Sequence, residues 1–420
     1  MGVNDMSDKS LVVRSGGALG VSGVRDLKSV ESANALLNLR EKISQNTALV
    51  SDEWLDRLIK WFVRHSKPNK FLFHPFELMD KEKLKNIAEL SFSDRDYEFD
   101  DLPDEFENLY NLKSLSFGIA FKHLPKVICK LTWLKKLDMS ILADWDDWCG
   151  YCGNLKLSPL PNEFVNLQNL EVLELSAYKL YEFPNVICEL KNLKILNLSC
   201  CDLSVLPNEL TNLQGLEKLG IGSNNFGEFP KVGARLDTLN AFTAYNCGFT
   251  NLPNELENLQ NLRLLSIGDN NFGQVPKIIT KLTTITSLYI GNCGLTSLPN
   301  ELANLYRLRF LGISNNNFSE FPQVIFEFKN LIRLEMANCG FSTLPKDFAR
   351  LQNLEELDFG GEESYYKICC LNEFPRVILE LPYLRKLWIK SSLIDDEMAQ
   401  ILEIRGIIIN EPNKYKKAKK

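Results

Sequence analysis

The sequence predicts an α/β solenoid in which about 13 strands form one curved parallel sheet, with a helical N-terminal cap and a short C-terminal cap. Two observations lead to this fold class. Proline recurs in a Leu-Pro, Phe-Pro or Val-Pro pair at 23-residue intervals from Pro161 to Pro345. Most of these prolines follow a segment in which leucines recur in one fixed spacing. One such unit cannot bury its own leucines, whereas stacked units share a continuous core.

The leucine frame has the form L-x-x-L-x-L-x-x-N/C-x-F/L, and each copy predicts one strand and the turn that leaves it. A complete copy consists of Leu262, Leu265, Ile267, Asn270 and Phe272. The same frame begins at Leu112, Leu134, Leu170, Leu193, Leu216, Leu239, Ile285, Leu308, Leu331, Leu354 and Leu384. A degenerate copy at Ile87, Leu90 and Phe92 is expected to start the array.

These repeats resemble the leucine-rich-repeat family over roughly residues 81–390. Their 23-residue length and the phrase L-P-x-E-L-x-x-L-x-x-L are similar to the intracellular Ras-group repeats and their bacterial relatives. The resemblance implies a curved solenoid with the parallel sheet on its inner face. Insertions lengthen two of the repeats, near residues 142–155 and 361–370.

One position of the frame alternates between two residue types along the chain. It reads Cys201, Asn224, Cys247, Asn270, Cys293, Asn316 and Cys339. The repeating unit is therefore interpreted as a 46-residue pair. Asparagine is expected to bond buried backbone groups in the turn that leaves each strand, and cysteine to fill the same place as a small, weakly polar group.

The two ends of the chain differ from the repeats. Residues 1–28 are expected to be disordered because they carry glycine, serine and scattered charge. Residues 29–80 form a helical cap region, or a small interaction domain, because Leu55, Leu58 and Phe62 have helical spacing. Residues 391–410 predict a C-terminal cap made of a helix and a last strand. The basic tail, 411–420, is expected to be solvated or to contact an acidic partner.

The composition and charge of the sequence argue against some classes of partner and some cellular locations. The net charge of −6 gives no general reason to expect a nucleic acid. The sequence has no apolar run of about 18 residues that would span a membrane. Because no secretory signal is recognised, the eleven cysteines are interpreted as reduced thiols. A cytoplasmic protein is predicted, with export without a classical signal peptide as the alternative.

The sequence predicts no enzyme and no cofactor. His65, His74 and His123 do not have the spacing of metal ligands or of a nucleophile and its base. The motifs G-x-S-x-G, H-E-x-x-H and a phosphate-binding loop do not occur. A binding protein without a metal is therefore expected.

The insertion DWDDWCGYCGN, residues 144–154, is expected to be a loop at one edge of the solenoid. Trp145, Trp148 and Tyr151 favour a stiff aromatic loop that packs on the repeats or contacts a partner. Its Cys149 and Cys152 lack the two further ligands that a zinc site needs nearby, and no helix is expected there to activate a thiolate. A tolerated insertion and a metal or redox site remain the alternatives.

The inner face is predicted to be the binding surface. Frame positions that point away from the core carry Tyr245, Leu264, Tyr289 and Phe310, an apolar and aromatic strip. The strip is flanked by Asn246, Asn292 and Asn338, and Glu335 begins a more acidic C-terminal end. The alternative is that these residues only fill the rim of the sheet.

The function predicted from these features is an adaptor or scaffold that binds a protein or peptide on the concave face. The resemblance leaves open a bacterial effector or surface-associated protein that binds host molecules. An enzyme module that uses the loop cysteines and a reader of nucleic acid or carbohydrate are the rival classes.

Overall fold

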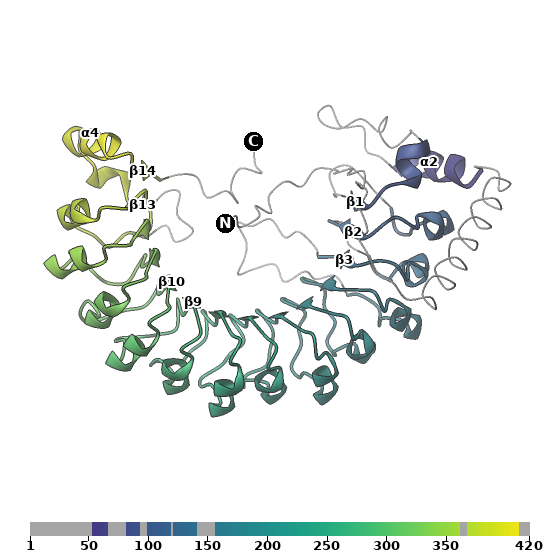
Figure 1. The fold of residues 1–420 in the computed structure, drawn as a ribbon, viewed down its shortest axis with the longest axis horizontal. Helices are drawn as coiled ribbons and strands as arrows, with labels where there is room; N and C mark the ends of the chain where they lie inside the picture. The colour runs from purple at the N-terminus through teal and green to yellow at the C-terminus, as the bar shows by residue number, and fades with distance from the viewer. Residues whose placement is uncertain are drawn as a thin grey trace, which may run out of the picture.

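Short strands lie side by side in chain order and form one parallel sheet along the inside of an arch (Figure 1). The computed structural model describes residues 53–65, 81–92, 99–118, 121–140, 156–361 and 368–410. Within these residues the strands are β1 (Glu89–Phe92), β2 (Ser114–Phe117), β3 (Lys136–Asp138), β4 (Val172–Glu174), β5 (Ile195–Asn197), β6 (Lys218–Gly220), β7 (Ala241–Thr243), β8 (Leu264–Ser266), β9 (Ser287–Tyr289), β10 (Phe310–Gly312), β11 (Arg333–Glu335), β12 (Glu356–Asp358), β13 (Lys386–Trp388) and β14 (Ile408–Ile409).

In the described residues, each strand from β1 to β13 is followed by a short 3-10 helix, and those from η1 to η13 lie on the outer side of the arch (Figure 1). These helices are η1 (Asp104–Asn108), η2 (Lys126–Lys130), η4 (Asn162–Asn166), η5 (Asn185–Glu189), η6 (Asn208–Asn212), η7 (Lys231–Arg235), η8 (Asn254–Asn258), η9 (Lys277–Lys281), η10 (Asn300–Asn304), η11 (Gln323–Glu327), η12 (Lys346–Arg350) and η13 (Arg376–Glu380), with η14 (Ser391–Leu393) after β13. The α-helices are α2 (Glu53–His65), α3 (Lys81–Lys85) and α4 (Asp396–Ile404).

A proline stands directly before each described 3-10 helix from η1 to η13. Pro161, for example, has φ −68° and ψ 156°, and its carbonyl accepts a bond of 3.0 Å from the backbone N–H of Phe164. Proline suits this N-cap place because its ring fixes φ near −65° and the N–H group that it lacks has no intrahelical acceptor there. The 23-residue spacing of proline from Pro161 to Pro345 therefore marks the start of each outer helix from η4 to η12.

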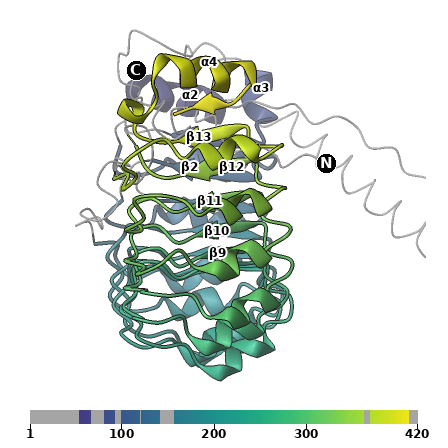
Figure 2. The same ribbon diagram turned by 90° about the vertical axis from the view of Figure 1, so that its left-hand side faces the viewer.

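The leucines of the frame form one continuous core between the sheet and the outer helices. The central strand residues Leu115, Leu196, Leu265 and Leu357 have no exposed surface. Figure 2 shows the same layers from the end of the arch, one strand and one outer helix above the next. The leucine-rich-repeat solenoid predicted from the sequence is confirmed, with fourteen strands in the described residues instead of about thirteen.

The alternating asparagines and cysteines lie in a buried ladder beside the sheet. The Oδ1 atom of Asn270 accepts bonds from the backbone N–H groups of Cys247, at 3.0 Å, and Phe249, at 2.9 Å. Its amide group donates to the carbonyls of Ala244 and Ile267. Asn224 and Asn316 make the corresponding bonds in their own repeats.

The cysteines of this ladder make weaker contacts in the same place. The thiol of Cys247 donates to the carbonyl of Ile221 at 3.2 Å, and Cys201, Cys293 and Cys339 bond in the same way. Burial raises the pKa of Cys247 to about 12. The expected structural roles of asparagine and cysteine are thus confirmed. Outside the ladder, Cys129 and Cys188 are buried in η2 and η5.

The helix α2 covers the first repeat with one apolar face. Leu55, Leu58 and Phe62 are buried, as their spacing predicts. The ring of Phe62 stacks on Phe92 at 5.9 Å, and Phe92 stacks on Phe117 at 5.5 Å. These stacked rings continue the core from the helical cap into β1 and β2.

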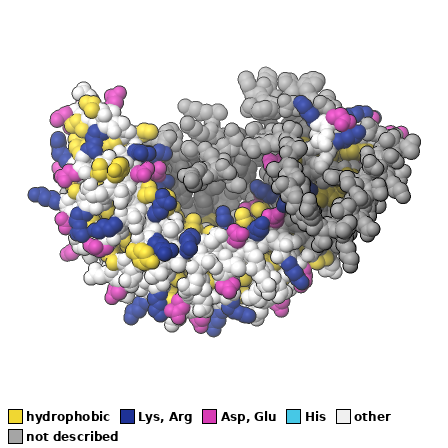
Figure 3. All heavy atoms as spheres, viewed as in Figure 1, with side chains coloured by type: hydrophobic (Ala, Val, Ile, Leu, Met, Phe, Trp, Pro, Cys, Tyr) yellow, Lys and Arg dark blue, Asp and Glu magenta, His cyan; other side chains and the backbone are white. Residues whose placement is uncertain are grey.

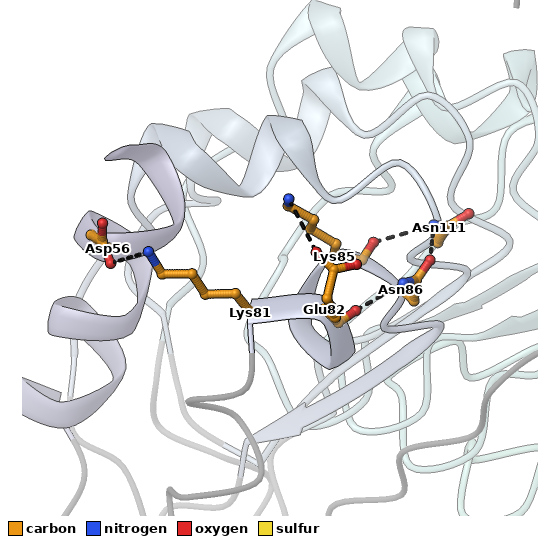
Figure 4. A network of polar contacts seen from close by, with 6 residues as sticks. All are labelled: Asp56, Lys81, Glu82, Lys85, Asn86 and Asn111. Carbon is orange, nitrogen blue, oxygen red and sulfur yellow. Dashed lines mark hydrogen bonds and ion pairs between the residues drawn. The ribbon is translucent and has the colours of Figure 1, made fainter. Parts of the chain in front are cut away.

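Polar contacts tie α2 and α3 to the start of the solenoid (Figure 4). Lys81 pairs with Asp56 of α2 at 2.8 Å. The side-chain amide of Asn111 donates to the carbonyl of Lys85 at 3.2 Å and to Oδ1 of Asn86 at 3.4 Å. The ion pair joins the two helices, and Asn111 joins α3 to the second repeat.

The C-terminal end closes as the sequence predicts, with a helix and a last strand. Asp395 caps α4 by accepting a bond of 2.7 Å from the backbone N–H of Met398. Met398 and Leu402 are buried against the last repeat, and β14 pairs in parallel with β13. None of the described helices has the length and apolar character that crossing a bilayer requires.

The predicted domain boundaries remain predictions. The proposed disordered segment 1–28, all of the cap region 29–80 except 53–65, most of the two insertions and the basic tail 411–420 lie outside the described residues.

Candidate binding surface

Two side chains of each strand point to the inner face, one on either side of the buried central residue. In β9 they are Ser287 and Tyr289, which flank the buried Leu288. Because the strands pair in register, these side chains line up across the sheet in two columns. The first column holds the residue before the central one of each strand, and the second column holds the residue after it. A third column follows in the turn, two residues after the second.

Three of the predicted strip residues gather around Ser287. Leu264 and Phe310 are its neighbours in the first column, on β8 and β10. Tyr289 lies beside them in the second column, and adjacent strands are about 4.8 Å apart. All three side chains are half-buried. We call Leu264, Tyr289 and Phe310 the apolar triad.

The ring of Tyr289 lies over Gly312, its neighbour in the second column. A Cβ atom at Gly312 would stand 2.7 Å from Cδ1 of Tyr289 and 3.4 Å from a carboxylate oxygen of Glu335. The glycine thus leaves room for the ring to lie toward β10. This orientation brings the tyrosine ring to the strand that carries Phe310.

Tyr245 lies apart from the apolar triad. It belongs to the third column, in the turn after β7, and its ring lies over Gly222 in the turn after β6. A Cβ atom at Gly222 would clash with Cε1 and Cδ1 of that ring. The predicted strip of four residues is therefore divided into the triad and a separate tyrosine.

The three predicted flanking asparagines lie in the turns next to the third column. Asn246, Asn292 and Asn338 have φ of 50°, 51° and 52°, the left-handed region that asparagine tolerates well. Their side-chain amides donate to Ser223, Asp269 and Asn315 respectively, at 3.2, 2.7 and 2.9 Å. These residues do border the concave face, but part of their bonding capacity joins neighbouring turns.

Glu335 belongs to a charged cluster that begins beside the triad. Arg333, the first-column neighbour of Phe310, pairs with Glu335 at 2.7 Å and with Glu356 at 3.0 Å. Lys386 reaches Glu356 at 3.7 Å. Burial lowers the pKa of Arg333, but the carboxylates of Glu335 and Glu356 outweigh this effect, so the pKa is raised overall. The acidic end is thus partly neutralised.

An aromatic ring borders this charged cluster. The guanidinium of Arg333 stands 5.7 Å from the ring of Trp388, which is in the second column of β13. Sequence reasoning did not select Arg333 or Trp388. Their places just before and just after a central leucine of the frame are the signal that identifies them.

Toward the N-terminal end of the solenoid, two lysines pair with one acidic residue. Lys135 and Lys194 hold Glu171 between them, at 2.7 and 2.8 Å. Their hydrogen bonds lower the pKa of Glu171 to about 2. In Figure 3, lysine and arginine atoms are interspersed with acidic ones over the visible outer rim, and no single sign of charge dominates it.

The predicted loop contacts Trp145, Trp148 and Tyr151 lie outside the described residues, as do Cys149, Cys152 and His74. Within the described ranges, no group of three or more His, Cys, Asp or Glu side chains is arranged to hold a metal ion. His65 bonds the carbonyl of Trp61 at 2.8 Å, and His123 bonds Ser158 at 2.8 Å. Both contacts are structural.

Comparisons with known proteins agree with this geometry. Residues 192–213 match the family model described as Leucine Rich Repeat. A leucine-rich-repeat protein of Leptospira interrogans is 26% identical, with a TM-score of 0.57, over 81% of this chain and 93% of that one. The search of curated proteins returned no match.

A second solved structure shares the fold alone. TLR13, in its complex with ssRNA13, is 20% identical with a TM-score of 0.53, over 79% of this chain. This chain spans 52% of the TLR13 chain.

Proposed function

Because the chain is built from leucine-rich repeats, we propose that it is a scaffold without catalytic activity that binds a protein or peptide on its concave face. The observation that supports this most directly is the apolar triad. Leu264, Tyr289 and Phe310 are apolar or aromatic, yet they occupy strand positions that point away from the core. Among the described residues, no helix or strand is laid over the inner face (Figure 1).

The surroundings of the triad suggest the character of the ligand. The triad offers an apolar and aromatic patch, and aromatic side chains are frequent anchors in protein contacts. The charged cluster of Arg333, Glu335, Glu356 and Lys386 begins one strand away from it. The best-matched ligand therefore has an apolar anchor followed by side chains of both charges.

Nucleic acid is a poorer match to this face. The net charge of the chain is −6, and the cluster beside the triad contains as many acidic as basic groups. We also propose that the chain acts in the cytoplasm, which fits the free thiols of the described cysteines.

The experiment that tests this proposal is affinity capture followed by a binding measurement. The intact chain and its Tyr289→Ala/Phe310→Ala variant capture proteins from a cell lysate, and mass spectrometry identifies those that only the wild type retains. A recovered partner is then titrated against both. Loss of two anchors is expected to weaken binding at least about tenfold.

A matched control separates the triad from general loss of apolar surface. The variant Tyr110→Ala/Val205→Ala removes two exposed apolar side chains, 60% and 69% accessible, far from β9 and β10. It is expected to retain wild-type affinity. Equal affinity of the triad variant for every recovered partner would contradict the concave-face site.

A bacterial version of the same proposal is favoured by one comparison. The Leptospira interrogans structure is a bacterial protein whose match spans 93% of its own chain. In this version the chain is exported without a classical signal peptide and binds a host protein. Its presence in the medium of intact cells under secretion-inducing conditions tests that version.

A further inference from the structure

We propose that the chain has a second binding surface, on the flank where strands β9–β13 begin, which takes an acidic segment of a partner protein. This surface is a shallow groove of about 680 Å³. Its lining includes Arg307, Arg309 and Arg385, together with Ile332, Glu355 and Tyr383. It is distinct from the apolar triad, and the proposal does not depend on binding at the concave face.

The flank has a regular structural pattern in neighbouring repeats. In several repeats, the side chain of the residue directly before the first leucine of the frame donates a hydrogen bond to a backbone carbonyl of the preceding repeat. Asn330 bonds the carbonyl of Tyr306 at 2.8 Å, Asn353 that of Lys329 at 2.7 Å, and Asn261 that of Asp237 at 3.0 Å. Thr284, at the same place before Ile285, bonds a different carbonyl of the preceding repeat, that of Leu262, at 2.8 Å. These bonds tie the repeats that carry them to the repeat before.

Arg307 departs from this pattern. It occupies the same place, directly before Leu308, where an asparagine or threonine side chain would bond the preceding repeat. Its guanidinium instead lies 5.5 Å from the ring of Tyr306, itself 55% exposed. A long cationic side chain thus replaces a structural one where the groove lies, which points to a role in contact with another molecule.

The charges of the groove are unevenly balanced. Among the described residues, Arg307 and Arg309 have no carboxylate within ion-pair distance, whereas Arg385 has Glu355 at 3.7 Å. Arg309 lies 5.9 Å from the ring of Phe310, and this contact limits the freedom of its side chain. Two guanidinium groups therefore stand one residue either side of Leu308 without an anionic partner of their own.

An acidic peptide fits this arrangement better than a nucleic acid does. Each guanidinium can hold a carboxylate through two parallel N–H···O bonds. A phosphate backbone needs a continuous basic track, but Glu355 and Ile332 interrupt the arginines. Tyr383 and Ile332 instead offer contacts for an apolar side chain. The expected ligand is a short segment with two or more carboxylates and one apolar residue.

The test uses the full chain and a fluorescent octapeptide, Gly-Glu-Glu-Leu-Glu-Glu-Leu-Gly, in a titration followed by anisotropy. The wild type is expected to bind the peptide more weakly as salt concentration rises. The variant Arg307→Gln/Arg309→Gln is expected to lose at least about tenfold in affinity. The same peptide with glutamine in place of glutamate is expected not to bind.

A charge-matched control is available on the outer side of the arch. Lys231→Gln/Arg235→Gln removes two exposed positive charges from η7 and is expected to bind as the wild type does. An equal loss of affinity in this variant would overturn the proposal, because net charge alone would then explain binding. Failure of the wild type to bind the acidic peptide would also overturn it.

A single-stranded RNA octamer distinguishes the rival class of partner. If it binds more tightly than the peptide and Arg307→Gln/Arg309→Gln abolishes that binding, the groove is a nucleic-acid site and the proposal is wrong. Circular dichroism and unfolding in urea of each variant show that its fold is retained. The variant Tyr289→Ala, which leaves the ring of Phe310 beside Arg309, is expected to bind the acidic peptide normally, and this result would separate the groove from the concave site.

Discussion

The ring of Tyr289 lies over Gly312, so that the side chain of one repeat occupies the space left by the absent side chain of the next. The relationship depends on two residues that are adjacent in the second column but 23 positions apart in sequence. It determines how the ring is presented beside Phe310. Its consequence for binding can be tested with a single methyl group.

Gly312→Ala is expected to weaken ligand capture more than it weakens the fold. The new Cβ atom would meet Cδ1 of Tyr289 at 2.7 Å, so the ring must turn away, while the sheet backbone has no need to move. We expect a loss of about 1 kcal/mol or less in unfolding free energy, and a several-fold loss in affinity for a concave-face partner. Gly220→Ala is the control, because its Cβ meets Asn197 and Thr243, away from the triad. Equal affinities for the two variants would argue against a role for the ring.

Asn270→Ala is expected to destabilise the solenoid strongly. The change leaves the buried backbone N–H groups of Cys247 and Phe249 without their acceptor. Each unsatisfied buried donor costs about 1–3 kcal/mol, so a loss of about 3 kcal/mol is expected in urea unfolding. Asn271→Ala, at the exposed next residue, should change stability by less than about 0.5 kcal/mol.

Cys293→Ala tests the weaker type of contact in the same ladder. The thiol of Cys293 bonds two backbone carbonyls, at 3.4 and 3.6 Å. Its replacement by alanine should lower the unfolding free energy by about 1 kcal/mol. If the alanine variants at 270 and 293 lost equal stability, the proposed difference between asparagine and cysteine in the ladder would be wrong.

Glu171 should contribute a pH-dependent part of the stability. Lys135 and Lys194 lower the pKa of its carboxyl from an ordinary 4.5 to about 2 in the folded chain. Since the folded pKa is below the unfolded one, the contribution is complete above pH 4.5 and disappears as the pH falls toward 2. Glu171→Gln should therefore be less stable than the wild type at neutral pH, by under about 1 kcal/mol because the lysines are exposed.

Unfolding in urea at several pH values measures this difference. The gap between wild type and Glu171→Gln is expected to close as the pH falls toward 2. Glu209→Gln, which changes an exposed carboxylate of η6, should show no such trend. A gap that stayed constant from pH 7 to pH 2 would show that the lysine contacts of Glu171 add nothing to stability.

The ladder cysteines should resist alkylation in the native protein. Burial raises the pKa of Cys247, Cys293 and Cys339 to about 12, so almost no thiolate forms at neutral pH. Iodoacetamide labelling followed by peptide mass spectrometry should modify the half-buried Cys200, Cys369 and Cys370 before the ladder cysteines. The ladder cysteines should react only after urea is added. Their modification in the native state at the same rate as Cys369 would contradict this burial.

Much of the fold follows from the sequence because one spacing decides which side chains face the core. The leucines of the frame, the asparagines of the ladder and the prolines before the outer helices all lie where their pattern predicts. The helix and strand of the C-terminal cap were also predicted, from Ile394 to Asn410. Local patterns therefore specify the strands and turns of the described repeats.

The binding surface was less predictable because it depends on contacts between repeats. The frame indicates that Tyr245 and Tyr289 leave the core, but the direction of each ring is set by a glycine in a neighbouring repeat. Arg333 escaped notice since its ion pairs join side chains from adjacent strands. Arg307 was missed because its place is recognised only once the bonds of Asn330 and Asn353 reveal the regular pattern.

The strict chain order of the sheet has a further consequence for how the molecule assembles. Each strand pairs only with the strands before and after it, so a typical contact closes a loop of one repeat and never spans the length of the chain. Such low contact order favours rapid folding from any interior nucleus, followed by growth toward both ends. Pulled from its two ends, the arch would then unravel repeat by repeat, and force spectroscopy would record a series of small steps.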